Sequence, residues 1–142
     1  MTIIPYQCGV MDCFCEMVAS GLKKLAMSHP CDTKAERDSY LPQVKKLCEK
    51  YGILYHPQDE ALITDLFPAE ANQDKYNYLF FRTQDVYETY LELKKNARKE
   101  LENQCGGTEE ERYQLAADFG ALLSYPEEGI RRLIEKTREA RR

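Results

Sequence analysis

Hydrophobic positions near the start of the chain recur three and four residues apart, the spacing of one face of an α-helix. This pattern predicts a helix from about Cys8 to Ser28, ended by His29 and Pro30. The expected apolar stripe consists of Val10, Phe14, Met17, Gly21 and Leu25. Because a glycine inside a helix costs about 1 kcal/mol relative to alanine, Gly21 predicts a close backbone crossing or a kink.

Two capping signals organise the next segment. Thr33 and Glu36 have the spacing of a capping box, which predicts a short helical turn after Thr33. Pro42 is then expected in the first turn of a second helix that ends at Tyr51. Gly52 follows that helix, where a left-handed backbone conformation costs glycine nothing.

The middle third of the chain changes to short apolar runs. Residues 75–82 are the strongest strand candidate, with aromatic side chains on one face and Leu79 and Phe81 on the other. We therefore expect both faces of this strand to be covered. The aromatic face consists of Tyr76, Tyr78 and Phe80. Residues 53–55 are a second strand candidate, whereas the run 61–67 fits either a strand or a helix.

Three further helices are predicted in the second half. Residues 84–104 carry the longest regular apolar seam, Thr108 with Glu111 forms a second capping box, and Pro126 opens a last helix. The seam consists of Val86, Tyr90, Leu93, Ala97 and Leu101. About five helices covering about 60% of the residues, with a small two- or three-stranded sheet in the middle third, predict one helix-rich α+β domain over residues 1–142.

Charge and hydropathy exclude several classes of function. The chain has 24 acidic and 20 basic residues, a formal charge of −4 and a pI near 5.3, so we expect no nucleic-acid partner. No apolar run approaches the roughly 18 residues that cross a membrane, and the first ten residues lack the features of a secretion signal. We therefore expect no membrane partner and a cytoplasmic location. No glycine-rich phosphate loop is present, so no nucleotide cofactor is expected.

Cysteine usage suggests reduced thiols, because the chain has enough apolar residues for a core without disulfides. The six cysteines are Cys8, Cys13, Cys15, Cys31, Cys48 and Cys105. His29 and Cys31, separated by one residue, are the candidate metal ligands, with one or two other thiols completing the set. Structural zinc sites usually contain a second such pair, and the chain offers none. The default expectation is therefore packed thiols and no metal.

A cysteine followed by glycine near a helix start could be activated, because the helix dipole lowers a thiol pKa there. Residues Cys8 and Gly9 resemble the start of the active-site helix of papain-like cysteine peptidases, although Gln7 directly precedes the cysteine here. The resemblance implies that Cys8 is a nucleophile assisted by a histidine and an oriented carboxylate or amide. Further candidates for catalytic residues are Cys13, His29 and Asp65; without a fixed partner, Asp65 is expected to be a surface acid or helix cap.

Together these observations favour a cytosolic accessory or interaction domain that acts by binding a protein partner or a second copy of itself. The expected contact surfaces are the apolar seam of residues 84–104 and the aromatic strand. The alternative is a cysteine-dependent enzyme, or a thiol- or metal-responsive protein, centred on Cys8 and Cys13.

Overall fold

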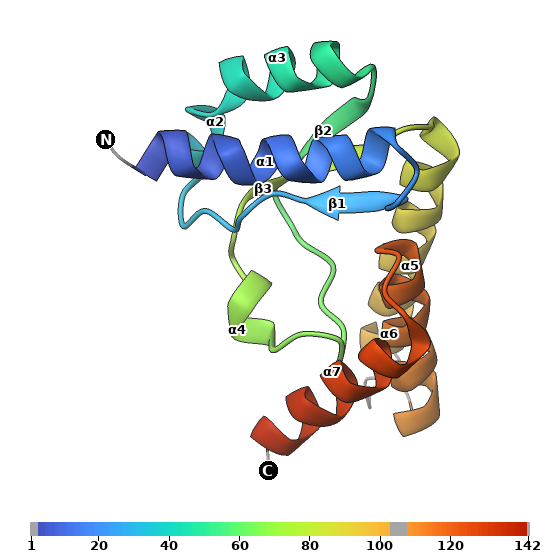
Figure 1. Cartoon of the computed structure of the whole chain (residues 1–142). Helices are drawn as coiled ribbons and strands as arrows, with labels where there is room; N and C mark the ends of the chain where they lie inside the picture. Colours follow the sequence, from blue (N-terminus) through green and yellow to red (C-terminus); the bar gives the residue numbers. More distant parts are fainter. Residues whose placement is uncertain (1–2, 103–107, 142) are drawn as a thin grey trace.

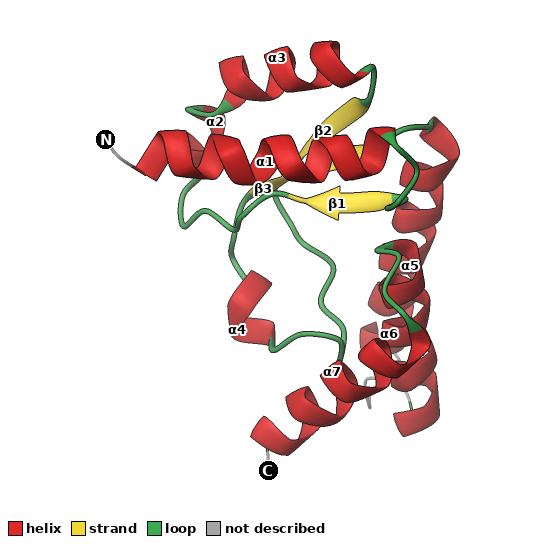
Figure 2. Cartoon of the chain, in the orientation of Figure 1, coloured by secondary structure: helices red, strands yellow, loops and turns green. Residues whose placement is uncertain are grey.

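The computed structural model describes the backbone of residues 3–102 and 108–141, and the side chains of residues 6–98 and 108–141. These residues form seven helices and one three-stranded antiparallel sheet (Figures 1 and 2), with 61% of the chain helical. The helices are α1 (Ile3–Ala19), α2 (Lys34–Asp38), α3 (Leu41–Tyr51), α4 (Ala69–Asn72), α5 (Gln84–Glu102), α6 (Glu109–Leu122) and α7 (Glu127–Ala140). The strands are β1 (Leu25–Met27), β2 (Leu54–Gln58) and β3 (Asn77–Phe81). The predicted helix-rich α+β class is confirmed.

Strand β3 lies between β1 and β2 and separates two hydrophobic cores. Because side chains alternate along a strand, Tyr78 and Phe80 enter one core, while Leu79 and Phe81 enter the other. Every residue of β3 is buried, so the prediction that both of its faces are covered is confirmed.

The first core lies between the sheet and helices α1 and α3 (Figure 1), and its buried members are Met11, Cys15, Val18, Ala26, Cys31, Tyr40, Val44, Cys48, Ile53, Tyr78 and Phe80. The second core lies between the sheet and helices α5, α6 and α7. Its buried members are Leu25, Leu62, Leu66, Leu79, Phe81, Tyr90, Leu93, Leu115, Ala116, Phe119, Leu122, Leu123, Ile130 and Ile134.

The predicted helix over residues 8–28 is wrong at both ends. Helix α1 begins at Ile3 and ends at Ala19, and Gly21 takes the left-handed conformation with φ 86° instead of lying inside a helix. The chain then turns back as β1, where Leu25 pairs with Phe81 of β3. The buried face of α1 is also rotated from the predicted stripe: it contains Met11, Cys15 and Val18. Pairing with a distant strand outweighs the local helical spacing here.

Residues 61–67 form neither a strand nor a helix; they are a loop from which Leu62 and Leu66 enter the second core and Phe67 packs against it. Side chains from α5 and α7 form hydrogen bonds with the backbone of this loop. Leu62 N–H donates to Tyr90 Oη at 3.1 Å, and Thr137 Oγ1 donates to the Leu66 carbonyl at 3.3 Å. The four-residue helix α4 follows this loop. The sequence pattern, which predicts about five helices, does not predict it.

Both predicted capping boxes are present. Thr33 Oγ1 accepts from Glu36 N–H at 3.1 Å, and Thr108 Oγ1 accepts from Glu111 N–H at 3.0 Å. Gly52 ends α3 in the left-handed conformation, with φ 67°. Local signals of this kind are read correctly because each depends on residues within one helical turn.

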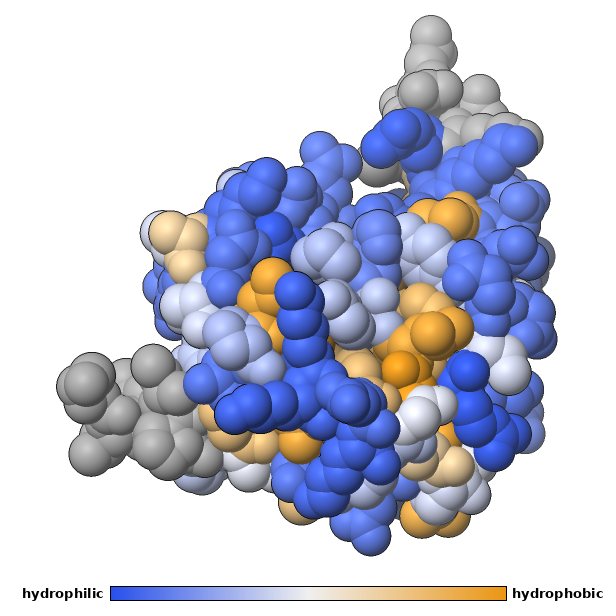
Figure 3. All heavy atoms as spheres, turned by 90° about the horizontal axis from the view of Figure 1, so that it is seen from above, coloured by the Kyte–Doolittle hydropathy of each residue, from blue (hydrophilic) through white to orange (hydrophobic). Residues whose placement is uncertain are grey.

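The expected contact surfaces are filled by the protein's own packing. On α5, Tyr90 and Leu93 are buried in the second core, and Val86 and Ala97 pack against it. The side chain of Leu101, the last position of the seam, and the whole of Cys105 lie outside the described residues. The face seen in Figure 3 is mostly hydrophilic, with hydrophobic side chains in separate patches.

Candidate metal centre

Residues 28–31, which follow β1, form backbone hydrogen bonds with Tyr76 and Tyr78 at the start of β3. Ser28 N–H donates to the Tyr78 carbonyl at 2.9 Å. Cys31 and Tyr76 then form an isolated bridge, in which each N–H donates to the other carbonyl, at 2.8 and 2.9 Å. The backbone at Cys31 is therefore held on both sides, and its thiol is buried at the edge of the first core.

The capping box of α2 turns a carboxylate toward this segment. Thr33 caps the helix, and Glu36 is the third residue after it. Asp32 N–H, one residue before the N-cap, donates to Glu36 Oε2 at 3.3 Å, so the glutamate reaches back past the helix start. Glu36 itself is exposed, so its other carboxylate oxygen is accessible to a ligand.

These two features bring together three side chains that can each donate an electron pair to a metal. We call His29, Cys31 and Glu36 the ligand cluster. His29 Nε2 lies 3.4 Å from Cys31 Sγ, and one donor atom from each of the three residues lies within 4.8 Å of the others. A nitrogen and a thiolate sulfur bound to one tetrahedral Zn²⁺ are roughly 3.6 Å apart, from bond lengths of about 2.05 and 2.3 Å. The His29–Cys31 pair has this spacing.

The protonation of the pair differs from that of an activated cysteine nucleophile. Burial lowers the pKa of His29, although the charge of Glu36 opposes this shift. Burial, with the negative charge of Glu36, raises the pKa of Cys31 to about 11. At neutral pH the imidazole is therefore neutral with a free lone pair, and the thiol keeps its proton. A nucleophilic cysteine needs the thiolate, whereas a metal ion can displace the proton when it binds.

The packing of His29 leaves one of its two ring nitrogens, Nδ1, without a hydrogen-bond partner among the described residues. Its ring packs edge-on against Tyr40, with ring centroids 4.9 Å apart. Nδ1 is buried. A buried polar atom without a partner costs free energy. Packing against Tyr40 therefore positions the His29 ring. Among the described residues, the contact of Nε2 with Cys31 Sγ is the one polar contact of the ring.

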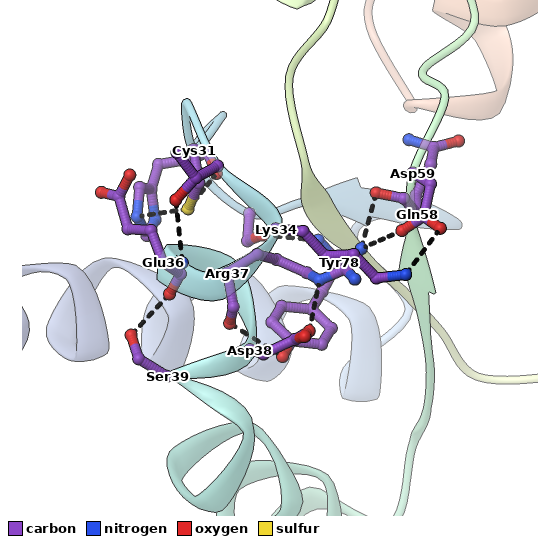
Figure 4. Close-up of polar contacts among 12 residues, drawn as sticks. Cys31, Lys34, Glu36, Arg37, Asp38, Ser39, Gln58, Asp59 and Tyr78 are labelled. Atoms are coloured by element: carbon purple, nitrogen blue, oxygen red, sulfur yellow. Dashed lines mark hydrogen bonds and ion pairs between the residues drawn. The ribbon is translucent and has the colours of Figure 1, made fainter.

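The opposite side of α2 is anchored by Arg37, whose side chain is only 3% exposed. Figure 4 shows Cys31 and Glu36 on one side of this short helix and Arg37 extending away from them, toward Gln58 and Asp59. One guanidinium nitrogen of Arg37 donates to the Gln58 carbonyl and to Asp59, both at 2.8 Å, and Nε donates to Asp38 at 2.9 Å. The arginine fixes the helix that carries Glu36, while its charge is taken up by acids outside the cluster.

The other cysteine candidates do not join this cluster. Cys8 lies within α1 and packs against the first core, and burial raises its pKa, the opposite of activation by a helix end. Cys13 is exposed on the same helix. Cys15 and Cys48 are buried where α1 meets α3, and the interaction between the two thiols raises the pKa of Cys15 and lowers that of Cys48. The five cysteines that the structure describes are free thiols.

Asp65 is buried and is neither a surface acid nor a helix cap. It lies between Leu62 and Leu66, two residues of the second core, and accepts a hydrogen bond from Arg138 Nε at 3.1 Å. The expectation of a surface position is wrong because arginines from α6 and the C-terminal helix neutralise the carboxylate. Those arginines are too distant in sequence for spacing to indicate them.

Glu36 was predicted only as a capping residue, and its proximity to His29 and Cys31 was missed. The available signal was the capping box itself, since its glutamate points back toward the residues before the helix. His29 and Cys31 occupy that position in the sequence, two to four residues before Thr33. A capping box preceded by a His-x-Cys pair therefore predicts a three-residue cluster.

Among the residues that the structure describes, no helix combines the length and the apolar character that crossing a membrane requires. Comparison of the chain with protein-family models, curated proteins and solved structures found no match.

Proposed function

We propose that the protein binds a Zn²⁺ ion at His29, Cys31 and Glu36 and acts as a metal-responsive protein. The observation that carries the proposal is the 3.4 Å approach of His29 Nε2 to Cys31 Sγ, together with one donor atom from each of His29, Cys31 and Glu36 lying within 4.8 Å of the others. The proposal takes up one of the alternatives drawn from the sequence, a metal-responsive protein, with His29 and Cys31 as its ligands in place of Cys8 and Cys13.

The chemistry of the three donors favours Zn²⁺ over Mg²⁺ and Ca²⁺. Imidazole nitrogen, thiolate sulfur and carboxylate oxygen are all ligands of Zn²⁺. Mg²⁺ and Ca²⁺ take oxygen ligands and would leave the thiol and the imidazole unused. Two anionic ligands, the Cys31 thiolate and the Glu36 carboxylate, also neutralise a dication in a partly buried position, where an unpaired charge is costly.

Zn²⁺ is four-coordinate in most protein sites, so three protein ligands leave one position for water or an incoming group. The three ligands belong to two different pieces of structure, the segment after β1 and the first turn of α2. Ion binding therefore joins these pieces and stabilises the folded segment by linkage. The ion would keep an open fourth coordination position, and one of its ligands would be an accessible carboxylate. Both features favour reversible binding, as a metal-responsive protein requires.

Metal affinity measured by competition with a chromogenic chelator tests the proposal, and the chain offers matched controls. Cys31→Ala and His29→Gln each remove one ligand. Cys13→Ala and His56→Gln change residues of the same type at exposed positions outside the cluster. Each ligand variant should bind Zn²⁺ at least ~10-fold more weakly than wild type, because loss even of an outer-shell partner typically costs ~10–100-fold. The control variants should bind as wild type does.

Glu36→Gln separates ligation from folding, because glutamine preserves the capping box but removes the negative charge. It should retain the wild-type circular dichroism spectrum and lose Zn²⁺ affinity. Equal affinity in Cys31→Ala and Cys13→Ala, or one-to-one binding that survives all three ligand changes, would contradict the proposal.

Association with a protein partner or a second copy, and a cytoplasmic location, stay predictions. Size-exclusion chromatography with light scattering checks the first. A mass above the 16.6 kDa of one chain supports self-association.

A further inference from the structure

A second candidate site lies in a cavity of about 360 Å³ next to the second core. Its walls come from the 61–67 loop, the start of α4, and helices α5, α6 and α7. Phe67, Ala97 and Leu115 form an apolar part, and Arg112 and Arg141 form a polar part beside Asp65. Drug-sized ligands occupy cavities of ~300–1,000 Å³ that are mostly apolar with a few convergent polar groups. This cavity has that composition at the small end of the range.

The polar part contains more hydrogen-bond donors than the protein uses. Three guanidinium groups surround the single buried carboxylate of Asp65: Arg138 at 3.1 Å, Arg141 at 3.2 Å and Arg112 at 3.5 Å. Each guanidinium carries five N–H donors, whereas a carboxylate offers about four acceptor positions. The donors therefore exceed the acceptors that Asp65 provides.

Arg112 is the group with the clearest unused capacity. Its Nε is buried and has no hydrogen-bond partner within the described part of the chain, since 3.5 Å to Asp65 Oδ2 is too long for a hydrogen bond of good geometry. Arg138, in contrast, also donates to the Glu109 carbonyl at 2.9 Å. Besides Asp65, the acids near these arginines are Glu109, 4.0 Å from Arg138, and Glu70, which is exposed where it lines the cavity. Neither forms an ion pair with Arg112 or Arg141 in the described residues.

We propose that this cavity binds a small organic carboxylate with an apolar body, such as a medium-chain fatty acid. The ligand's carboxylate accepts hydrogen bonds from Arg112 and Arg141, which present planar N–H pairs suited to a carboxylate. Its hydrocarbon part lies against Phe67, Ala97 and Leu115. The site lies beside the second core, whereas Cys31 of the ligand cluster belongs to the first core, so it does not depend on metal binding.

Isothermal titration with sodium octanoate tests the inference, with octanamide as a neutral probe of the same length. Arg141→Gln is the first variant, because its side chain is 55% exposed and Arg112 and Arg138 still pair with Asp65, so the fold should be retained. Arg132→Gln is the matched control: it lies on α7, the helix that Arg141 directly follows, is 74% exposed and does not line the cavity. We expect octanoate to bind more tightly than octanamide. Binding should weaken about 10-fold or more in Arg141→Gln, as expected for loss of a charged hydrogen bond, and stay unchanged in Arg132→Gln.

Arg112→Lys provides a second test of carboxylate binding, because lysine keeps the charge but loses the planar pair of donors. It should weaken octanoate binding and leave the far-ultraviolet circular dichroism spectrum unchanged. The inference is overturned if octanoate does not bind at millimolar concentration, if octanamide binds equally well, or if Arg141→Gln binds as tightly as wild type.

Discussion

The contact between α6 and α7 leaves no room for a side chain at Gly120. A Cβ atom placed there would lie 2.6 Å from Ile130 Cγ1 and 2.9 Å from Ile130 Cδ1, well inside van der Waals contact. Ile130 is itself buried in the second core, so it cannot move away freely. Gly120→Ala should therefore be destabilising even though alanine is the better helix former.

The expected size follows from two opposing terms. Overpacking a tight core costs typically ~1–3 kcal/mol, and contacts this short place Gly120→Ala toward the upper end of that range. Replacing glycine by alanine inside a helix contributes about 1 kcal/mol in the other direction. We expect Gly120→Ala to lower the free energy of unfolding by roughly 1–2 kcal/mol.

The sign should reverse when the obstacle is removed. In an Ile130→Ala background the three atoms nearest the added Cβ are gone, since all of them belong to Ile130 beyond its Cβ. Gly120→Ala should then raise stability by up to about 1 kcal/mol. Chemical denaturation of the four proteins of this double-mutant cycle measures both effects and their coupling. If Gly120→Ala has the same sign and size in both backgrounds, the close approach of α6 and α7 at Gly120 does not exist.

Three further predictions concern charges. Arg37→Met should lower the free energy of unfolding by roughly 2–4 kcal/mol because it removes a buried guanidinium that donates three hydrogen bonds. Lys34→Met also loses an ion pair with Asp59, but at an exposed position, and should cost less than about 1 kcal/mol. Asp65→Asn should cost a similar ~2–4 kcal/mol, since Arg138 is largely buried and keeps its charge; an unchanged urea midpoint would refute this. Burial and the charge of Lys94 lower the pKa of His56 in the folded state. The unfolded chain therefore binds this proton more readily, so stability present above pH ~6.5 is lost as the pH falls below it, and His56→Gln should make urea denaturation midpoints less dependent on pH between ~7.5 and ~5.5.

Elements defined by local sequence were predicted well. The capping boxes at Thr33 and Thr108, the glycine end at Gly52 and the two-faced strand at residues 77–81 each depend on neighbours within a few positions. Their interactions are short-range, so their residues identify them without knowledge of the rest of the fold.

Elements defined by distant partners were not predicted. Residues 25–27 have the spacing that would continue a helix, but hydrogen bonding to β3 makes them a strand. The loop of residues 61–67 is apolar without being regular, because Tyr90 and Thr137 satisfy its backbone from other helices. No window of sequence contains these partners.

The residues of the candidate site also fall into a part that the sequence predicts and a part that it does not. The separation of His29 and Cys31 by one residue identified a possible ligand pair, and the structure places their side chains in contact. The sequence assigns Glu36 to capping alone, although the His-x-Cys pair just before the capping box is a local signal for the cluster. Asp65 receives no predicted partner because its arginines lie far along the chain. Cys8 and Cys13 attracted attention through sequence context, yet they lie on α1 outside the cluster.

Titration of the reduced protein with Co²⁺ tests the central claim most directly, since cobalt takes the place of zinc and its absorption spectrum reports its ligands. We expect one equivalent of tetrahedral Co²⁺ with a thiolate-to-metal charge-transfer band that disappears in Cys31→Ser and persists in Cys13→Ser. A titration that produces no thiolate band, or one that gives the same band in Cys31→Ser, would contradict it.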